Sequence, residues 1–176
     1  MMFQNQKGFT LLEMLVVVVV IGIVAAIAAP GWLSFLERNR LISARDQLYL
    51  GIRQAQAEAQ YKSTTWQFSL RESDELIEWA VHPLSTSPDV AQWESIDSQS
   101  IRIDDETTFV NSGGTYYVRF NEKGHPHRLG RITLSGQRFS SNKRCLIVST
   151  IIGAARKAKD QSTPDPDYRR KDRFCY

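Results

Sequence analysis

The chain has 176 residues, a length that suits one domain of ordinary size and excludes a large multidomain enzyme. Charged residues make up 23% and hydrophobic residues 42%, which excludes a disordered tail and a multi-spanning membrane protein. The net charge of +3 hides an asymmetry, because residues 37–118 carry seven basic and 13 acidic side chains whereas residues 119–176 carry 14 basic and five acidic ones. This indicates an anionic partner for the basic part, contact between complementary neighbours in an oligomer, or an ordinary solvated surface.

An uncharged run of 23 residues, 14–36, dominates the N-terminal part. As a helix rising ~1.5 Å per residue it extends about 35 Å, enough to cross ~30 Å of hydrocarbon. The run is too long for the apolar stretch of a conventional secretory signal peptide. Lys7 is the one basic residue before it, and the positive-inside tendency places that end in the cytoplasm and the polar remainder outside.

Glu13 lies near the start of this apolar segment. An ionised carboxylate in hydrocarbon costs several kcal/mol unless it is paired, so its presence indicates a function. The alternative is that the side chain snorkels to the cytoplasmic interface, since it lies at the edge of the run. The chemistry of the residue alone leaves both interpretations open.

The string Lys7-Gly8-Phe9-Thr10-Leu11-Leu12-Glu13, followed by a Val/Ile/Ala-rich run and Pro30, resembles the class III signal of type IV pilins and type II secretion pseudopilins. The resemblance implies that a prepilin peptidase cuts after Gly8 and methylates the new N-terminus at Phe9. It also implies that Glu13 pairs with the free amine of a neighbouring subunit, which makes a buried carboxylate tolerable. Pro30 agrees with the family, where a proline at this position softens the helix by removing a backbone donor.

Apolar residues continue the helical pattern beyond the membrane segment at spacings of three and four. They are Leu41, Ala44, Leu48, Ile52, Ala55 and Ala59. We therefore expect one helix from Thr10 to about Tyr61. Its first half would lie in lipid or in a filament core, and its second half would pack on a domain.

After Ser63 the pattern changes to short β-rich runs separated by turn residues. Strands are predicted at 64–70, 76–82, 100–104, 107–110, 116–120, 130–135 and 144–151. The polar stretch 71–75 is predicted to be a hairpin connection, and 83–97 a loop. One long helix followed by seven strands is an α+β pattern, in which a small antiparallel sheet buries one side against the helix.

A phenylalanine before the turn 120–124, the strand 130–134 and a last strand 145–149 ahead of Gly153 resemble the C-terminal domain of GspH/FimT-type minor pilins. Many members carry Gly-Arg-x-Arg after the last strand, and the transformation-linked FimT group uses it for DNA. Here 153–156 reads Gly-Ala-Ala-Arg, so alanine stands at the first arginine position. Arg156, Lys157 and Lys159 keep the stretch basic, which leaves DNA contact and an ordinary solvated tail as the two interpretations.

Cys145 and Cys175 lie in the part predicted to be outside the cytoplasm, where oxidation is favoured. A disulfide between them would stabilise the fold by roughly 3 to 4 kcal/mol on the chain-entropy model. Free thiols are the alternative.

The histidines give no sign of a metal or catalytic site. His125 and His127 have no further ligand near them in sequence to complete a metal set, and His82 has no identifiable catalytic partner. We therefore expect no enzyme activity, no metal and no cofactor.

These features predict a leader at 1–8, a transmembrane and filament-core helix at 9–36, its amphipathic continuation at 37–62 and a β-rich body with a basic tail at 63–176. The resemblance implies a structural minor pilin or pseudopilin that assembles into a type IV pilus or a type II secretion pseudopilus, at or near the tip. It starts as a single-pass protein of the inner membrane, with its N-terminus cytoplasmic and its body periplasmic. The implied partners are other pilins, the prepilin peptidase and methylase, and the inner-membrane assembly platform with its ATPase. The alternatives are a DNA-binding minor pilin in DNA uptake and a bitopic, membrane-anchored periplasmic binding protein.

Overall fold

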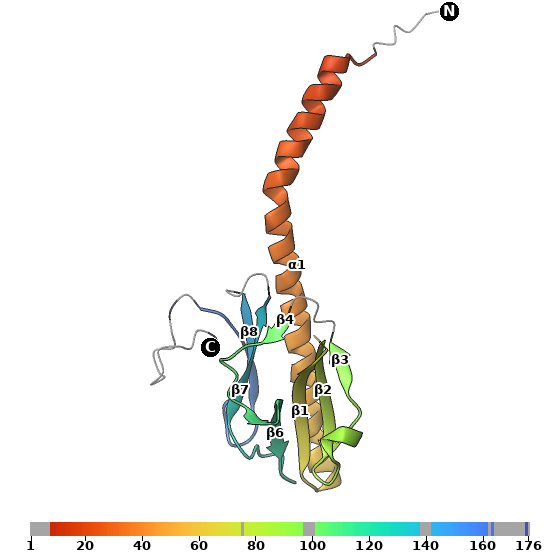
Figure 1. Cartoon of the computed structure of the whole chain (residues 1–176). Helices are drawn as coiled ribbons and strands as arrows, with labels where there is room; N and C mark the ends of the chain where they lie inside the picture. The colour runs from red at the N-terminus through yellow and green to blue at the C-terminus, as the bar shows by residue number, and fades with distance from the viewer. Residues whose placement is uncertain are drawn as a thin grey trace, which may run out of the picture. The chain divides into compact units, whose positions relative to one another are not determined.

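The structure is a computed structural model that describes residues 8–74, 76–96, 101–137, 142–161, 163 and 175. Two compact units divide the chain, Met1–Leu36 and Glu37–Tyr176. One helix, α1 (Leu11–Lys62), begins in the first unit and ends in the second (Figure 1). The leader residues 1–7 and the basic tail residues Arg169, Arg170, Lys171 and Arg173 lie outside the described residues.

In the second unit, α1 buries the apolar face that the sequence predicts. All six residues of the predicted stripe, from Leu41 to Ala59, are at most 1% exposed. Gly51 lies on the same face, and a Cβ atom built there would come within 2.6 Å of the Trp79 ring and 2.8 Å of Phe68. The absence of a side chain at Gly51 therefore lets the helix approach these two aromatic rings, which stack with centroids 6.1 Å apart.

Two antiparallel sheets form the rest of this unit (Figure 1). The first has the strand order β3-β2-β1-β6-β5 and the second the order β4-β7-β8-β9. The strands of the first are β1 (Trp66–Ser73), β2 (Leu76–Pro83), β3 (Glu94–Ile96), β5 (Val110–Ser112) and β6 (Thr115–Phe120). Those of the second are β4 (Ile101–Ile103), β7 (Gly130–Gly136), β8 (Lys143–Val148) and β9 (Ala155–Lys159), and a 3₁₀ turn, η1 (Pro88–Val90), precedes β3.

The predicted fold class, a long helix with an antiparallel β domain, is confirmed, but the sheet is divided in two and some strand bounds were wrong. The hairpin connection is shorter than the predicted stretch 71–75, because β1 continues to Ser73 and β2 begins at Leu76. Arg71 pairs with Glu78 across the hairpin at 2.8 Å and stacks on Trp93, so polar side chains are satisfied within the strand. Two strands, β3 and β9, lie where no strand was expected, and β8 ends at Val148 rather than at 151.

The strand expected at 107–110 is displaced to β5, because the segment before β5 crosses from one sheet to the other. Thr108 donates its backbone N–H to the Arg131 carbonyl of β7 at 2.9 Å. The Thr107 hydroxyl donates to the Thr133 carbonyl and accepts the Thr133 N–H. These bonds join the segment to β7 through side chains and single backbone contacts, and the regular hydrogen-bond ladder of a strand does not form there.

Candidate functional site

The first turn of α1 contains the predicted assembly residues. Thr10 precedes the helix, and its hydroxyl accepts the backbone N–H of Glu13 at 3.2 Å. The Thr10 carbonyl accepts the N–H of Met14 at 3.2 Å. Thr10 is therefore an N-cap, and Glu13 lies three residues later, where the positive end of the helix dipole favours a carboxylate. The sequence signal for this cap is Thr-x-x-Glu, a spacing that is typical of a helix N-terminus and that was missed.

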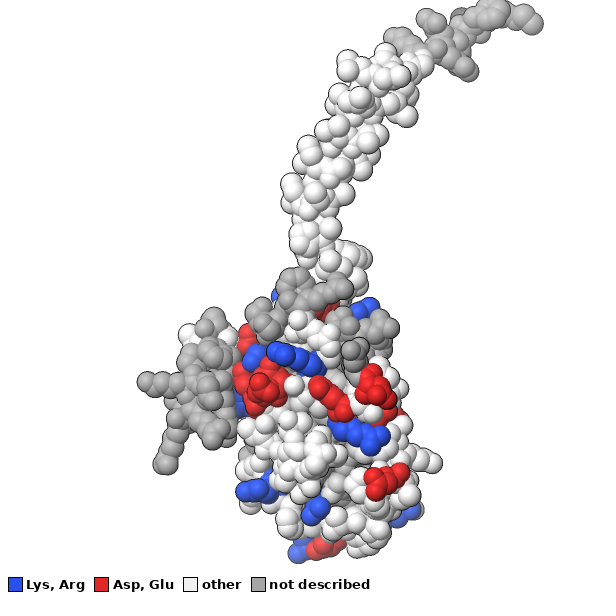
Figure 2. Space-filling model, viewed as in Figure 1, with Lys and Arg blue, Asp and Glu red and all other residues white. Residues whose placement is uncertain are grey.

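The apolar part of α1 that follows is exposed along its whole described length. Between Phe9 and Phe35 the large hydrophobic side chains are 44–84% exposed. The helix is long and apolar enough to cross a membrane, and Figure 2 shows almost no charge on the visible surface of this segment. Pro30 lies inside the helix without ending it. A contiguous apolar surface of this size needs lipid or protein to cover it.

A group of small residues in this segment leaves a shallow apolar groove of about 610 Å³ beside Trp32 and Phe35. The two rings lie 5.9 Å apart between centroids. Small residues allow close approach of another helix in an apolar environment. The groove is therefore part of the same exposed apolar surface as the rest of the segment, which lipid or protein has to cover.

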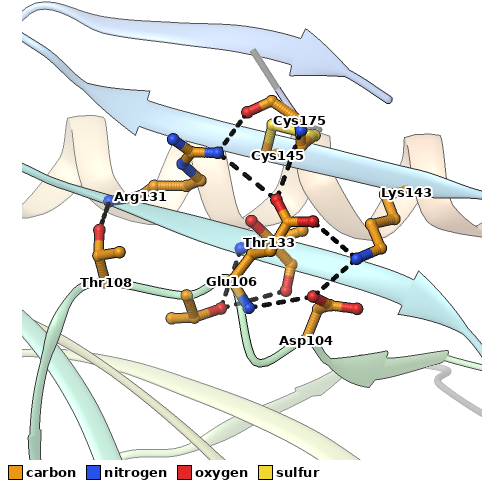
Figure 3. A network of polar contacts seen from close by, with 9 residues as sticks. Asp104, Glu106, Thr108, Arg131, Thr133, Lys143, Cys145 and Cys175 are labelled. Atoms are coloured by element: carbon orange, nitrogen blue, oxygen red, sulfur yellow. Dashed lines mark hydrogen bonds and ion pairs between the residues drawn. A yellow bond between two sulfur atoms is a disulfide. The ribbon is translucent and has the colours of Figure 1, made fainter. Parts of the chain in front are cut away.

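The body holds a network of buried charges on sheet β4-β7-β8-β9 and the loop after β4 (Figure 3). The Lys143 ammonium contacts Asp104 at 3.1 Å and Glu106 at 2.7 Å. Arg131, only 3% exposed, contacts Glu106 at 3.6 Å on the other side. Each buried charge thus has an opposite charge within contact distance, which is the condition under which burial is tolerable.

The same network holds the residue near the end of the chain. Cys175 forms a disulfide with Cys145 of β8. Its carbonyl accepts a hydrogen bond from Arg131 Nη1 at 2.6 Å, and its N–H donates to Glu106 Oε2 at 3.4 Å. Cys175 is fully buried. The disulfide and two polar contacts therefore fix this point of the chain against the sheet.

The pKa shifts in this network follow from its geometry. Burial by itself would raise the pKa of the Asp104 carboxyl, but hydrogen bonds from the Glu106 N–H and from Lys143 hold that pKa below its usual value. Burial would likewise lower the pKa of Lys143, but Glu106 and Asp104 raise it above its usual value. Both groups are therefore charged at neutral pH.

His82 is buried and has a partner that the sequence did not reveal. Its Nε2 lies 3.0 Å from the Ser69 hydroxyl, and its Nδ1 lies 3.1 Å from the Pro83 carbonyl. A carbonyl can only accept, so Nδ1 carries the proton and the Ser69 hydroxyl donates to Nε2. Ser69 is fully buried, so the pair is part of the packing of β1 on β2 and not a reactive site.

The other predicted residues are on the surface. Arg156, Lys157 and Lys159 lie on β9, an edge strand, and Lys157 contacts Asp46 of α1 at 3.1 Å. His125 and His127 are exposed in the turn before β7. Within the described part of the chain, no group of three or more His, Cys, Asp or Glu side chains is arranged to hold a metal ion.

Comparison with known proteins supports the N-terminal assignment. Residues 3–29 match the family model of the prokaryotic N-terminal methylation motif. The chain is 46% identical over 44 residues to fimbrial protein EcpC of Eikenella corrodens, a match covering 25% of this chain and 29% of that protein. It is 39% identical over 46 residues to the type IV major alpha-pilin of Moraxella bovis, covering 26% and 29%. The matched part is thus under a third of the length of these relatives, which are fimbrial proteins and pilins rather than enzymes.

The body has a relative among solved structures. The fold is similar to that of the type IV minor pilin FimU of Pseudomonas aeruginosa, with a TM-score of 0.53 and 16% sequence identity, over 69% of this chain and 90% of that one. At this identity the likeness concerns the fold alone. It extends the similarity beyond the N-terminal motif to the helix and sheets. The chain is therefore similar to type IV pilins in its N-terminal segment, which matches the prokaryotic N-terminal methylation motif, and to a minor pilin in its fold.

Proposed function

We propose that the chain is a structural subunit of a pilus or pseudopilus that is cut after Gly8, methylated at Phe9 and assembled through Glu13. The single observation that carries this proposal is the N-terminal segment, where a methylation motif leads into an apolar helix that the chain itself leaves uncovered. A soluble enzyme would bury such a surface in its own core. A filament subunit covers it first with lipid and then with the helices of neighbouring subunits.

Glu13 has two tasks in this proposal. Its N–H completes the cap at Thr10, and its position in the first helical turn favours the charged carboxylate. Cleavage after Gly8 would create a cationic amine at Phe9. The Phe9 amine of an incoming subunit would pair with Glu13 of a neighbour, which replaces the lost hydration of the carboxylate when the segment leaves the lipid headgroup region.

Position and partners follow from the same proposal. The N-terminus would lie in the cytoplasm and the body in the periplasm, in keeping with Lys7 before the span. Prepilin peptidase, an inner-membrane platform with its ATPase, and other pilins would be the partners. The minor-pilin likeness of the fold favours a place at or near the filament tip and a GspH/FimT-type body. Type IV pilus and type II secretion pseudopilus would share all of these steps.

N-terminal analysis of the membrane form tests the proposal against a bitopic protein that keeps its leader. We expect methylated Phe9 as the first residue of the protein expressed with a prepilin peptidase, and Met1 in cells that lack the peptidase. A Gly8→Ala variant serves as the control that keeps the membrane span but loses the cleavage site. An intact Met1 in the presence of the peptidase would overturn the proposal.

The DNA-uptake alternative has less support from the geometry. Lys157 is engaged with Asp46, and Ala154 stands where the family pattern has its first arginine. A mobility-shift assay at low and high salt, with Arg156, Lys157 and Lys159 changed to alanine, tests this alternative. DNA binding that is lost in that variant would support it.

A further inference from the structure

A cationic pocket of about 460 Å³ lies between α1 and strands β8 and β9 of the second sheet, of which β9 is the edge strand. Ile42 and Ala158 provide its apolar lining. Five cationic side chains complete it: Arg45, Arg144, Arg156, Lys157 and Lys159. The three residues on β9 are candidates from the sequence alone. Only the fold shows that Arg45 and Arg144 line the same pocket.

The positive charge of this pocket is only partly balanced. Asp46 is shared between Arg45 at 2.9 Å and Lys157 at 3.1 Å. Among the described residues, no carboxylate lies within 4.0 Å of Arg144, Arg156 or Lys159. The pocket therefore holds three cations without an ion-pair partner in this part of the chain.

Two further observations show that like charges are crowded here. Arg144 lies directly opposite Lys159 in the β8–β9 ladder, an arrangement of like charges that destabilises a sheet. Burial, followed by the charges of Arg38 and Arg45, lowers the pKa of the Arg144 guanidinium, although the charge of Asp160 acts in the opposite direction. A bound anion would relieve this repulsion, so the pocket is built for an anionic group.

We infer that the pocket binds the phosphate of an anionic phospholipid headgroup. The helix residues on the pocket follow the uncharged segment closely, because Ile42 and Arg45 come six and nine residues after Leu36. At ~1.5 Å per residue, these separations are about 9 and 14 Å of helix rise, which long arginine side chains can bridge to the phosphate layer of a bilayer. Clusters of Lys and Arg beside a membrane helix favour anionic lipids.

The bound lipid would hold the body at the leaflet from which α1 emerges, before the subunit enters a filament. Guanidinium groups such as Arg144 and Arg156 suit this ligand, because their planar forks donate two parallel hydrogen bonds to phosphate oxygens. The membrane setting rests on the proposed function. Lipid preference does not require cleavage or assembly, however, so the two proposals can fail separately.

Native mass spectrometry of the full chain in a mild detergent tests the inference, with phosphatidylglycerol and phosphatidylcholine of identical acyl chains as probes. We expect at least about tenfold stronger retention of phosphatidylglycerol. The variant R144Q/R156Q/K159Q should lose this preference. The matched control K62Q/K123Q/R128Q removes three exposed cations elsewhere and should keep it.

A gain-of-binding variant keeps the test decisive if the triple variant folds poorly. Asp46→Asn removes the internal competitor of Arg45 and Lys157 and should strengthen phosphatidylglycerol retention about twofold to fivefold. Equal retention of both lipids by the wild-type chain would overturn the inference, as would an unchanged preference in the triple variant.

Two other anions are tested in separate arms. Inorganic phosphate at millimolar concentration should displace phosphatidylglycerol only weakly, and saturation of the pocket by phosphate without any lipid preference would overturn the lipid assignment. A random-sequence DNA oligonucleotide should bind no better to the wild type than to R144Q/R156Q/K159Q. DNA binding that depends on the pocket, with no preference among lipids, would assign the pocket to nucleic acid instead.

Discussion

The two units of this chain bury apolar surface in opposite ways. In the body, the stripe on α1 from Leu41 to Ala59 is almost fully buried against strands of the same chain. In the N-terminal segment, every large hydrophobic side chain from Phe9 to Phe35 is exposed by more than two fifths. The body is therefore stable by its own contacts, whereas the segment depends on whatever surrounds it. One continuous helix thus contributes a buried core face at one end and an exposed apolar surface at the other.

The carboxylates of the two regions show the same contrast. Glu106 in the body contacts Lys143 and Arg131, and these charges come from the same fold. Within the described residues, no cation contacts the carboxylate of Glu13, and the N–H of this residue donates to the Thr10 hydroxyl. The described charges of the network in the body are paired within the body, whereas the proposed function assigns Glu13 a partner from a neighbouring subunit.

The largest effect is expected from breaking the internal charge pairing of the body. Arg131→Ala removes the contact with Glu106 and the hydrogen bond to the Cys175 carbonyl, which leaves Lys143 in contact with Glu106 among the described residues. Loss of one member of a buried pair costs about 3–5 kcal/mol. Denaturant unfolding followed by tryptophan fluorescence measures this loss, and the exposed Arg128→Ala is the matched control. Equal stability of the two variants would mean that the network contributes nothing.

A pair of identical substitutions in one helix compares the two regions directly. Ile52→Ala creates a cavity in the body and should lower the free energy of unfolding by about 2–5 kcal/mol. Ile21→Ala removes the same atoms from an exposed position and should leave the unfolding of the body unchanged. Both variants are measured in the same detergent. A comparable loss in Ile21→Ala would show that the segment takes part in the fold of the body.

A somewhat smaller loss of stability is expected when the disulfide that attaches Cys175 to β8 is removed. Replacement of Cys145 and Cys175 by serine should lower stability by about 2–4 kcal/mol. Mass spectrometry of the wild-type protein without reductant should show the loss of two hydrogens from these cysteines. Free thiols in the protein isolated from an oxidising compartment would contradict the bond.

The smallest expected effect is the pH dependence of the network. The pKa of Asp104 is lowered in the fold, so its contribution to stability is present above the unfolded value of 3.8 and is lost as the pH falls through the folded pKa. The pKa of Lys143 is raised, so its contribution is present below 10.5 and is lost as the pH rises through the folded pKa. The contribution of these two groups should therefore be flat between these limits, and Asp104→Asn should weaken the acid-side decline. The exposed Asp89→Asn should leave that decline unchanged.

Sequence periodicity predicted the helix and its buried stripe, because the spacing of apolar residues depends only on local geometry. It missed β9, whose sequence Ala-Arg-Lys-Ala-Lys was interpreted as a basic stretch after the last strand. An edge strand is where exposed lysine and arginine are favoured, since they discourage pairing with other chains. The polar residues Arg71 and Glu72 were likewise assigned to a turn, although the ion pair to Glu78 keeps them in β1.

The N-terminal site could be predicted from the sequence, whereas the contacts between distant residues in the body could not. The residues of the N-terminal motif are close together in the chain, so the sequence shows Gly8, Phe9 and Glu13 at once. The partners in the body are distant in sequence and depend on strand register. Ser69 reaches His82 because β1 pairs with β2, and Arg144 joins Arg45 because β8 packs near α1. No pattern within one segment could have predicted these contacts.

The central claim is that Glu13 needs a partner from a neighbouring subunit. The most direct test is to measure how much of a Glu13→Ala subunit is incorporated into filaments. The variant should keep a folded body, since Glu13 lies in the first unit and the core of the body is formed by residues of the second, and it should be cut normally after Gly8. We expect it to remain in the membrane and to be absent from sheared filaments, while a Glu58→Ala control at a partly exposed position of the same helix assembles as the wild type does. Normal incorporation of the Glu13→Ala subunit would contradict the account.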